Sequence, residues 1–106
     1  MQERRQAERI LLNVPVRWKS LLTQGRGTIS DLSVLGCFVL AGAEVDAGEL
    51  IRLQIDFGNH FVFAWARVVY AVPEMGFALQ FIFADENEQR AMATLVDKLR
   101  RGTVPI

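Results

Sequence analysis

Alternation between apolar and polar residues runs through most of the chain and predicts a protein built mainly of β-strands. The clearest stretch is residues 50–57, LIRLQIDF, in which every second residue is apolar, as in a strand with one buried face. Residues 76–83, GFALQFIF, alternate in the same way. Further strand-like segments, separated by Gly, Ser and Asp residues, lie at 14–22, 25–32, 36–42 and 60–72. The chain is therefore expected to hold about six short strands.

Turn signals connect the later strands. Gly58 and Asn59 stand between two apolar runs, which predicts a tight hairpin. The sequence PEM at 73–75 predicts a second turn. Short strands joined in this way favour an antiparallel arrangement.

The hydrophobic period changes after residue 84 and predicts one amphipathic helix, at about 86–101. Asp85 suits the N-cap, Glu88 stands three residues later as a capping-box partner, and Gly102 can end the helix. Apolar residues then recur at helical spacing, at Met92, Leu95, Val96 and Leu99. We expect a mainly β fold, a small closed or nearly closed antiparallel β-barrel, with this C-terminal α-helix covering an opening or an edge.

Composition and charge narrow the classes of function. A chain of 106 residues with 51% hydrophobic residues fits one domain with one core. Residues 1–9 are charged and almost free of apolar side chains, so we expect a flexible basic N-terminal arm at 1–9 and a single barrel domain at 10–106. Twelve basic and twelve acidic residues cancel, so the chain lacks the overall positive field of a general nucleic-acid binder. Any anion site must be local.

Residues that could carry catalysis are scarce. Cys37 is the single cysteine and His60 the single histidine, so neither a disulfide nor a cysteine-based metal site can form within the chain. His60 is interpreted as a solvated residue beside the hairpin, and Cys37 as a buried structural thiol. We expect no enzyme activity, no cofactor and no metal. Without a run of about 18 apolar residues or a signal-peptide pattern, a cytoplasmic protein without membrane insertion is expected.

Arginines of the arm form the first part of a candidate ligand site. The planar guanidinium of arginine can bind phosphate oxygens or the O6/N7 edge of guanine through two hydrogen bonds. Three arginines on an arm would be able to close over a guanine nucleotide. Charged residues at a terminus are also commonly just solvated, so this alternative stays open. The arginines are Arg4, Arg5 and Arg9.

The sequence DLSVLG at residues 31–36 forms the second part. Asp31 and Ser33 are two residues apart, so in a strand they would point to the same face. The carboxylate would accept a guanine N1–H or N2–H proton, and the hydroxyl would reach a phosphate or base. Gly36 would permit a positive φ or a close approach of the backbone to a ligand. The same residues are also ordinary turn chemistry.

The order of these two motifs resembles that of the PilZ domain family. Arg5 and Arg9 form R-x-x-x-R, and D-x-S-x-x-G follows about twenty residues later at 31–36. The resemblance extends to VPVRW, ARVVY, MGFALQF and the terminal amphipathic helix, and so to essentially the whole chain. It implies a six-stranded antiparallel barrel that binds the bacterial second messenger cyclic di-GMP.

The resemblance also implies roles for individual residues. Arg5 and Arg9 would clamp phosphates and guanine edges, with Arg4 as an adjacent donor. Asp31, Ser33 and Gly36 would form the barrel side of the site. Tyr70, near the end of ARVVY, matches a position where some members stack a ring near the nucleotide, although a core or rim role is the alternative.

The expected function is that of a non-catalytic cyclic di-GMP receptor that acts through an unidentified effector protein, for example in motility, adhesion or polysaccharide export. The first alternative is a protein–protein adaptor of the same fold that binds no nucleotide. The second is a small β-barrel that binds single-stranded nucleic acid, which would need a basic, aromatic-lined face. The zero net charge argues against the second alternative, and nucleic acid is not expected as a partner.

Overall fold

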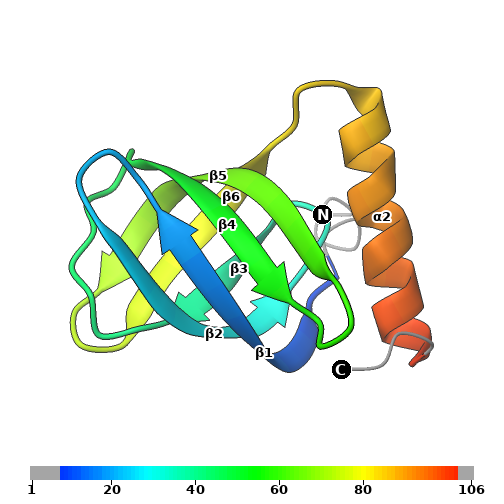
Figure 1. The fold of residues 1–106 in the computed structure, drawn as a ribbon, viewed down its shortest axis with the longest axis horizontal. Helices are drawn as coiled ribbons and strands as arrows, with labels where there is room; N and C mark the ends of the chain where they lie inside the picture. Colours follow the sequence, from blue (N-terminus) through cyan, green and yellow to red (C-terminus); the bar gives the residue numbers. More distant parts are fainter. Residues whose placement is uncertain (1–7, 103–106) are drawn as a thin grey trace.

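The described part of the chain folds as a closed barrel of six antiparallel strands with one helix at its end (Figure 1). The computed structural model describes residues 8–102. The strands are β1 (Ile10–Lys19), β2 (Gln24–Leu32), β3 (Gly36–Leu40), β4 (Leu50–Asp56), β5 (Phe61–Val72) and β6 (Gly76–Ile82), and the helix is α2 (Glu86–Arg101). Around the barrel the order is β1-β2-β3-β6-β5-β4, with β4 pairing back to β1. The predicted fold class is confirmed.

The first strand differs from its predicted bounds at both ends. It begins at Ile10, four residues early, because Ile10 pairs with Leu32 at the end of β2. It ends at Lys19 because Ser20 donates its N–H to the carbonyl of Thr23 at 2.7 Å and turns the chain. Residues 20–22, predicted to lie in a strand, therefore form part of a turn.

The barrel interior follows the alternation seen in the sequence. In β4 and the residue after it, the apolar set Ile51, Leu53, Ile55 and Phe57 is fully buried. The rings of Trp18 and Phe77 come from opposite sides of the barrel and meet in a T-shaped contact, with centroids 5.4 Å apart. These buried side chains form one continuous core.

Helix α2 stands across one end of the barrel (Figure 1). Its start is capped as predicted, since the Asp85 side chain accepts a hydrogen bond from the N–H of Glu88 at 3.0 Å. The Glu88 carboxylate accepts from the N–H of Ala84, one residue before the N-cap. The helix ends at Gly102 in the left-handed conformation, φ 75°. Its buried residues Met92, Val96 and Leu99 join the core, so the helix covers the barrel opening.

The Cys37 thiol is buried within the barrel wall, as predicted. Burial raises its pKa to about 12, the negative charge of Asp31 adds to this effect, and the positive charge of Arg9 opposes it. Thiolate is the form that reacts with electrophiles. Cys37 is therefore a structural thiol.

We predict that the Cys37 thiol reacts with a disulfide reagent at pH 8 far more slowly in the native chain than in the chain unfolded by guanidinium chloride. The folded pKa of about 12 lies above the ordinary thiol value of 9.0. The contribution of the Cys37 thiol to stability is therefore complete below pH 9 and declines as the pH rises toward 12. Native labelling as fast as denatured labelling would contradict the buried position.

Candidate ligand-binding site

The turn between β2 and β3 is built around Ser33. Strand β2 ends at Leu32, so Ser33 begins the turn, and its side chain is only 2% exposed. The Ser33 oxygen accepts hydrogen bonds from the N–H of Leu35 at 3.1 Å and from that of Gly36 at 3.3 Å. The Ser33 N–H donates to the Gly36 carbonyl at 2.8 Å. The prediction that Ser33 and Asp31 share a strand face is therefore wrong, because the hydroxyl is turned inward to hold the turn.

Gly36 is required by packing between strands. A Cβ at this position would lie 1.9 Å from the backbone oxygen of Leu79 in β6. The residue before Gly36 also binds β6, since the Leu35 carbonyl accepts a hydrogen bond from the N–H of Phe81 at 2.8 Å. Gly36 is not among the glycines with positive φ. The positive φ considered for this glycine is therefore wrong, and the close approach that the structure describes is to β6; an approach to a ligand stays a prediction.

Arg9 and Asp31 meet at the surface beside this turn. Arg9 directly precedes β1, and the pairing of Leu11 with Asp31 brings the two side chains together. The Arg9 Nη1 lies 2.5 Å from Asp31 Oδ1, with the side chains 60% and 22% exposed. The structure thus joins one residue from each sequence motif, across 22 positions of the chain.

Glu8, the acidic residue next to Arg9 in the sequence, pairs with the helix and not with Arg9. The Glu8 carboxylate lies 3.5 Å from the guanidinium of Arg100 on α2. Arg100 also pairs with Asp97 at 2.6 Å. Glu8 therefore anchors the entry to β1 against the helix and leaves Arg9 to Asp31.

Arg4 and Arg5 lie outside the described residues. Their part in the site, and the character of the arm at 1–7, remain predictions. Of the R-x-x-x-R motif, the structure describes the second arginine, Arg9.

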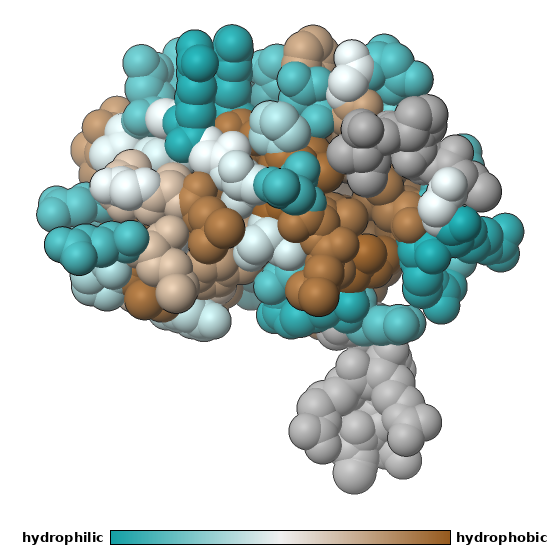
Figure 2. Space-filling model, turned by 90° about the horizontal axis from the view of Figure 1, so that it is seen from below, coloured by the Kyte–Doolittle hydropathy of each residue, from teal (hydrophilic) through white to brown (hydrophobic). Residues whose placement is uncertain are grey.

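An aromatic strip on the barrel surface continues from Asp31. Cross-strand pairing places Asp31 opposite Phe38, Phe38 opposite Ala78, and Ala78 opposite Tyr70. The rings of Phe38 and Tyr70 have centroids 6.5 Å apart. Three strand spacings separate Asp31 from Tyr70, roughly 14 Å. Figure 2, which views the molecule from below, shows patches of apolar surface exposed between polar groups.

Tyr70 is therefore a surface residue, 54% exposed, and not part of the core. Phe38 was missed by sequence reasoning, although its position two residues after Gly36 in an alternating strand was a signal. Its ring lies close over Gly76, where a Cβ would come within 3.0 Å of it.

Other candidate residues have ordinary structural roles. His60 is exposed in the turn after Gly58, as predicted, with its ring stacked on Phe57 and its Nδ1 within 2.8 Å of the Asn59 side-chain oxygen. Within residues 8–102, no group of three His, Cys, Asp or Glu side chains is placed to hold a metal ion. No helix in the same range has the length and apolar content needed to cross a membrane.

Comparison with known proteins identifies the family. The model of the PilZ domain matches residues 3–98. The chain belongs to the PilZ domain family, as its sequence motifs predicted. No curated protein matches it.

Three solved structures share the fold. The PilZ domain of CeSA from a cellulose-synthesizing bacterium has TM-score 0.73 and 18% identity, over 89% of this chain and 99% of that one. MotI/DgrA of Bacillus subtilis, described as an inhibitor of motility, has TM-score 0.70 and 21% identity, over 93% of this chain and 52% of that one. YcgR of Escherichia coli, solved with c-di-GMP, has TM-score 0.78 and 19% identity, over 93% of this chain and 47% of that one. The chain thus spans about half the length of the last two proteins.

We predict that Gly36→Ala lowers the free energy of unfolding by about 1–3 kcal/mol, because the new methyl group collides with the Leu79 backbone oxygen. Gly42→Ala is the matched control, since a Cβ there meets nothing within 4 Å. Denaturant unfolding of both variants measures the difference. An unchanged midpoint for Gly36→Ala would contradict the packing role.

Proposed function

We propose that this chain is a non-catalytic receptor for cyclic di-GMP. The observation that carries the proposal is the contact of Arg9 with Asp31 on the barrel surface, beside the turn held by Ser33. Membership of the PilZ family supports it, as does the c-di-GMP bound to one protein of the same fold.

The two charged groups have the chemistry that a guanine nucleotide needs. Arg9 would donate to phosphate oxygens or to guanine O6 and N7, and Asp31 would accept from guanine N1–H and N2–H. In the described structure each neutralises the other. An exposed ion pair is worth less than about 1 kcal/mol, so exchanging it for contacts with a ligand costs little.

The other motif residues would support nucleotide binding in different ways. Ser33 and Gly36 would act by holding the β2–β3 turn against β6, which fixes the position of Asp31. Phe38, directly opposite Asp31, and Tyr70, whose ring lies beside that of Phe38, offer an apolar surface on which a base could stack. Arg4 and Arg5 would add donors from the arm as it closes over the nucleotide.

The receptor would act through its altered surface. Closure of the arm over the nucleotide changes which charges and apolar groups the barrel presents, and an effector protein would recognise the change. Binding of an intracellular second messenger requires a cytoplasmic location, which is part of the proposal.

We predict that isothermal titration detects cyclic di-GMP binding at tens of micromolar nucleotide or below, and that Arg9→Ala weakens it roughly 10- to 100-fold, because hydrogen bonds to charged groups are lost. The matched control is Arg90→Ala, which removes an exposed arginine on α2. No heat with the unaltered chain would reject the receptor and favour the adaptor. Equal affinity in Arg9→Ala would show that the arm does not clamp the ligand.

We further predict that Asp31→Ala weakens nucleotide binding by roughly tenfold without lowering the melting temperature. The Asp31 side chain contacts Arg9, whereas the turn is held by the Ser33 hydroxyl. Calorimetric titration and thermal unfolding of the same sample measure both properties. A large loss of stability would show that Asp31 acts through the fold and not through the ligand.

A further inference from the structure

A cluster of four basic side chains lies on the barrel at the end far from Asp31. Arg17 stands opposite Arg26 across the β1–β2 pair, and Lys19 stands opposite Arg52 across the β1–β4 pair. Like charges directly opposite each other destabilise a sheet. Within residues 8–102, none of the four forms an ion pair, although the Arg52 guanidinium lies 5.1 Å from the centre of the Phe63 ring. The fold thus retains an electrostatic cost that an external anion would relieve.

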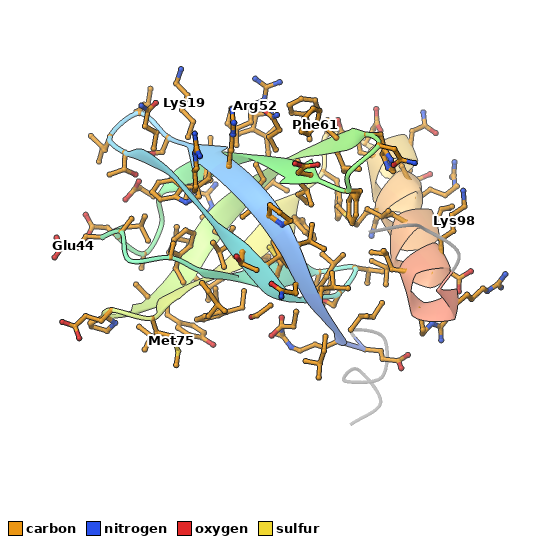
Figure 3. All side chains as sticks on the ribbon, turned by 60° about the horizontal axis from the view of Figure 1, so that its bottom comes forward. Lys19, Glu44, Arg52, Phe61, Met75 and Lys98 are labelled. Atoms are coloured by element: carbon orange, nitrogen blue, oxygen red, sulfur yellow. The ribbon has the colours of Figure 1, made fainter. Side chains whose placement is uncertain are left out.

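These four cations surround a shallow hollow of about 420 Å³. Figure 3 shows Lys19 and Arg52 projecting from the same side of the barrel, with Phe61 on that side and Met75 on the opposite one. Trp65, directly opposite Arg52 on β5, is half exposed beside the cluster. Tryptophan favours the boundary between an apolar phase and water.

Two leucines project from the turn that follows Lys19. Leu21 is 103% exposed and Leu22 is 75% exposed. They occupy the tip of the β1–β2 hairpin, directly beyond the basic cluster. Full exposure of two adjacent leucines at a protruding tip costs hydration free energy, and it leaves them free to enter another apolar phase.

The turn that carries these leucines is held firmly. The Ser20 oxygen accepts from the N–H of Leu22 at 3.1 Å and from that of Thr23 at 2.9 Å. The Ser20 and Thr23 hydroxyls both donate to the Glu49 carboxylate, at 2.8 and 3.1 Å. Glu49 also accepts from the N–H of Asp46, at 2.8 Å. The leucines are therefore presented by a braced loop. The four positive charges of the cluster outnumber the carboxylates near them, which are Glu49 at the turn and Asp56, in a hollow that it lines with Arg17 and Arg26.

We propose that this end of the barrel binds the surface of an anionic membrane, with Leu21 and Leu22 entering the interface and Arg17, Lys19, Arg26 and Arg52 contacting lipid phosphates. Apolar residues at a convex tip fit a deformable lipid phase better than a protein partner, whose interfaces centre on a broad apolar core. Single-stranded nucleic acid is the competing occupant, because bases stack on open aromatic faces and Phe61, Phe63 and Trp65 are about half exposed on this side (Figure 3). The two leucines at the tip favour the membrane, since they offer no face on which a base can stack, and Arg52 already lies over the Phe63 ring.

The proposed contact with the membrane is peripheral and needs no membrane-spanning helix, and no such helix occurs among the described residues. It departs from the sequence-based expectation of no membrane insertion, since that expectation rested on long apolar runs. It does not depend on nucleotide binding. Asp31 lies seven residue steps along β2 from Gln24, roughly 23 Å, so the proposed membrane-binding end and the nucleotide site are apart.

The first test is sedimentation of the full chain with lipid vesicles. We expect binding to vesicles of phosphatidylcholine with about 30 mol% phosphatidylglycerol, and at least tenfold weaker binding to phosphatidylcholine alone. Replacing Arg17 and Lys19 by Gln should weaken binding roughly fivefold per charge. The matched control is Arg90→Gln, on α2. No binding to the anionic vesicles, or equal binding to both, would overturn the proposal.

The leucines are tested by a dye attached at the tip. Because Cys37 is buried with its pKa raised to about 12, Leu21→Cys provides a selective site for an environment-sensitive dye. We expect a blue shift of its emission with anionic vesicles, and none for Met75→Cys, an exposed residue on the opposite side. The double variant Leu21→Ser with Leu22→Ser should bind vesicles roughly tenfold more weakly.

Two outcomes would contradict the insertion of the leucine tip into a membrane. One is an unshifted spectrum at position 21 in the presence of vesicles that bind the chain. The other is tighter binding of a twenty-nucleotide oligothymidine than of the vesicles, with the leucine variant unaffected, which would assign the cluster to nucleic acid.

Discussion

Closure of the barrel depends on the close approach of β3 and β6. These strands come from distant parts of the chain and pair through Gly36 opposite Gln80 and Leu40 opposite Gly76. At both ends of the pair a glycine faces a backbone oxygen, because a Cβ at Gly36 or at Gly76 would lie 1.9 Å from it. Without this approach the sheet would keep two open edges, and its core would open to water.

The close packing of β3 against β6 also positions the candidate site. The Leu35 carbonyl binds the N–H of Phe81, so the turn after β2 is attached to β6 as well as held internally by Ser33. Asp31 lies immediately before this turn and faces outward, where Arg9 reaches it. The D-x-S-x-x-G motif therefore combines one outward acid, Asp31, with two residues that hold the turn and its packing on β6, Ser33 and Gly36.

The charge distribution shows why net charge was a poor guide to surface chemistry. Opposite charges pair at the end of the barrel near α2, where Arg9 meets Asp31 and Arg100 meets Glu8. At the other end, basic residues of β1, β2 and β4 stand opposite one another with no described acid as partner. A total of zero thus conceals a local basic cluster, because pairing in the sheet brings together residues that are distant along the chain. Among the described residues, Glu44 and Glu49 lie at the same end of the barrel (Figure 3), and neither forms an ion pair with the four cations.

Periodicity and capping residues were enough to predict the strands, the helix and the buried faces of β4 and β6, because these depend on local spacing and on the sequestering of apolar side chains. Asp85 and Gly102 bound the helix through hydrogen bonds and backbone conformation within a few residues. Other features depended on contacts between strands. These are the role of Ser33, the packing partner of Gly36, the exposure of Tyr70 and the meeting of Arg17 with Arg26. Those contacts are set by the register and closure of the barrel, a property of the whole chain that no local pattern contains.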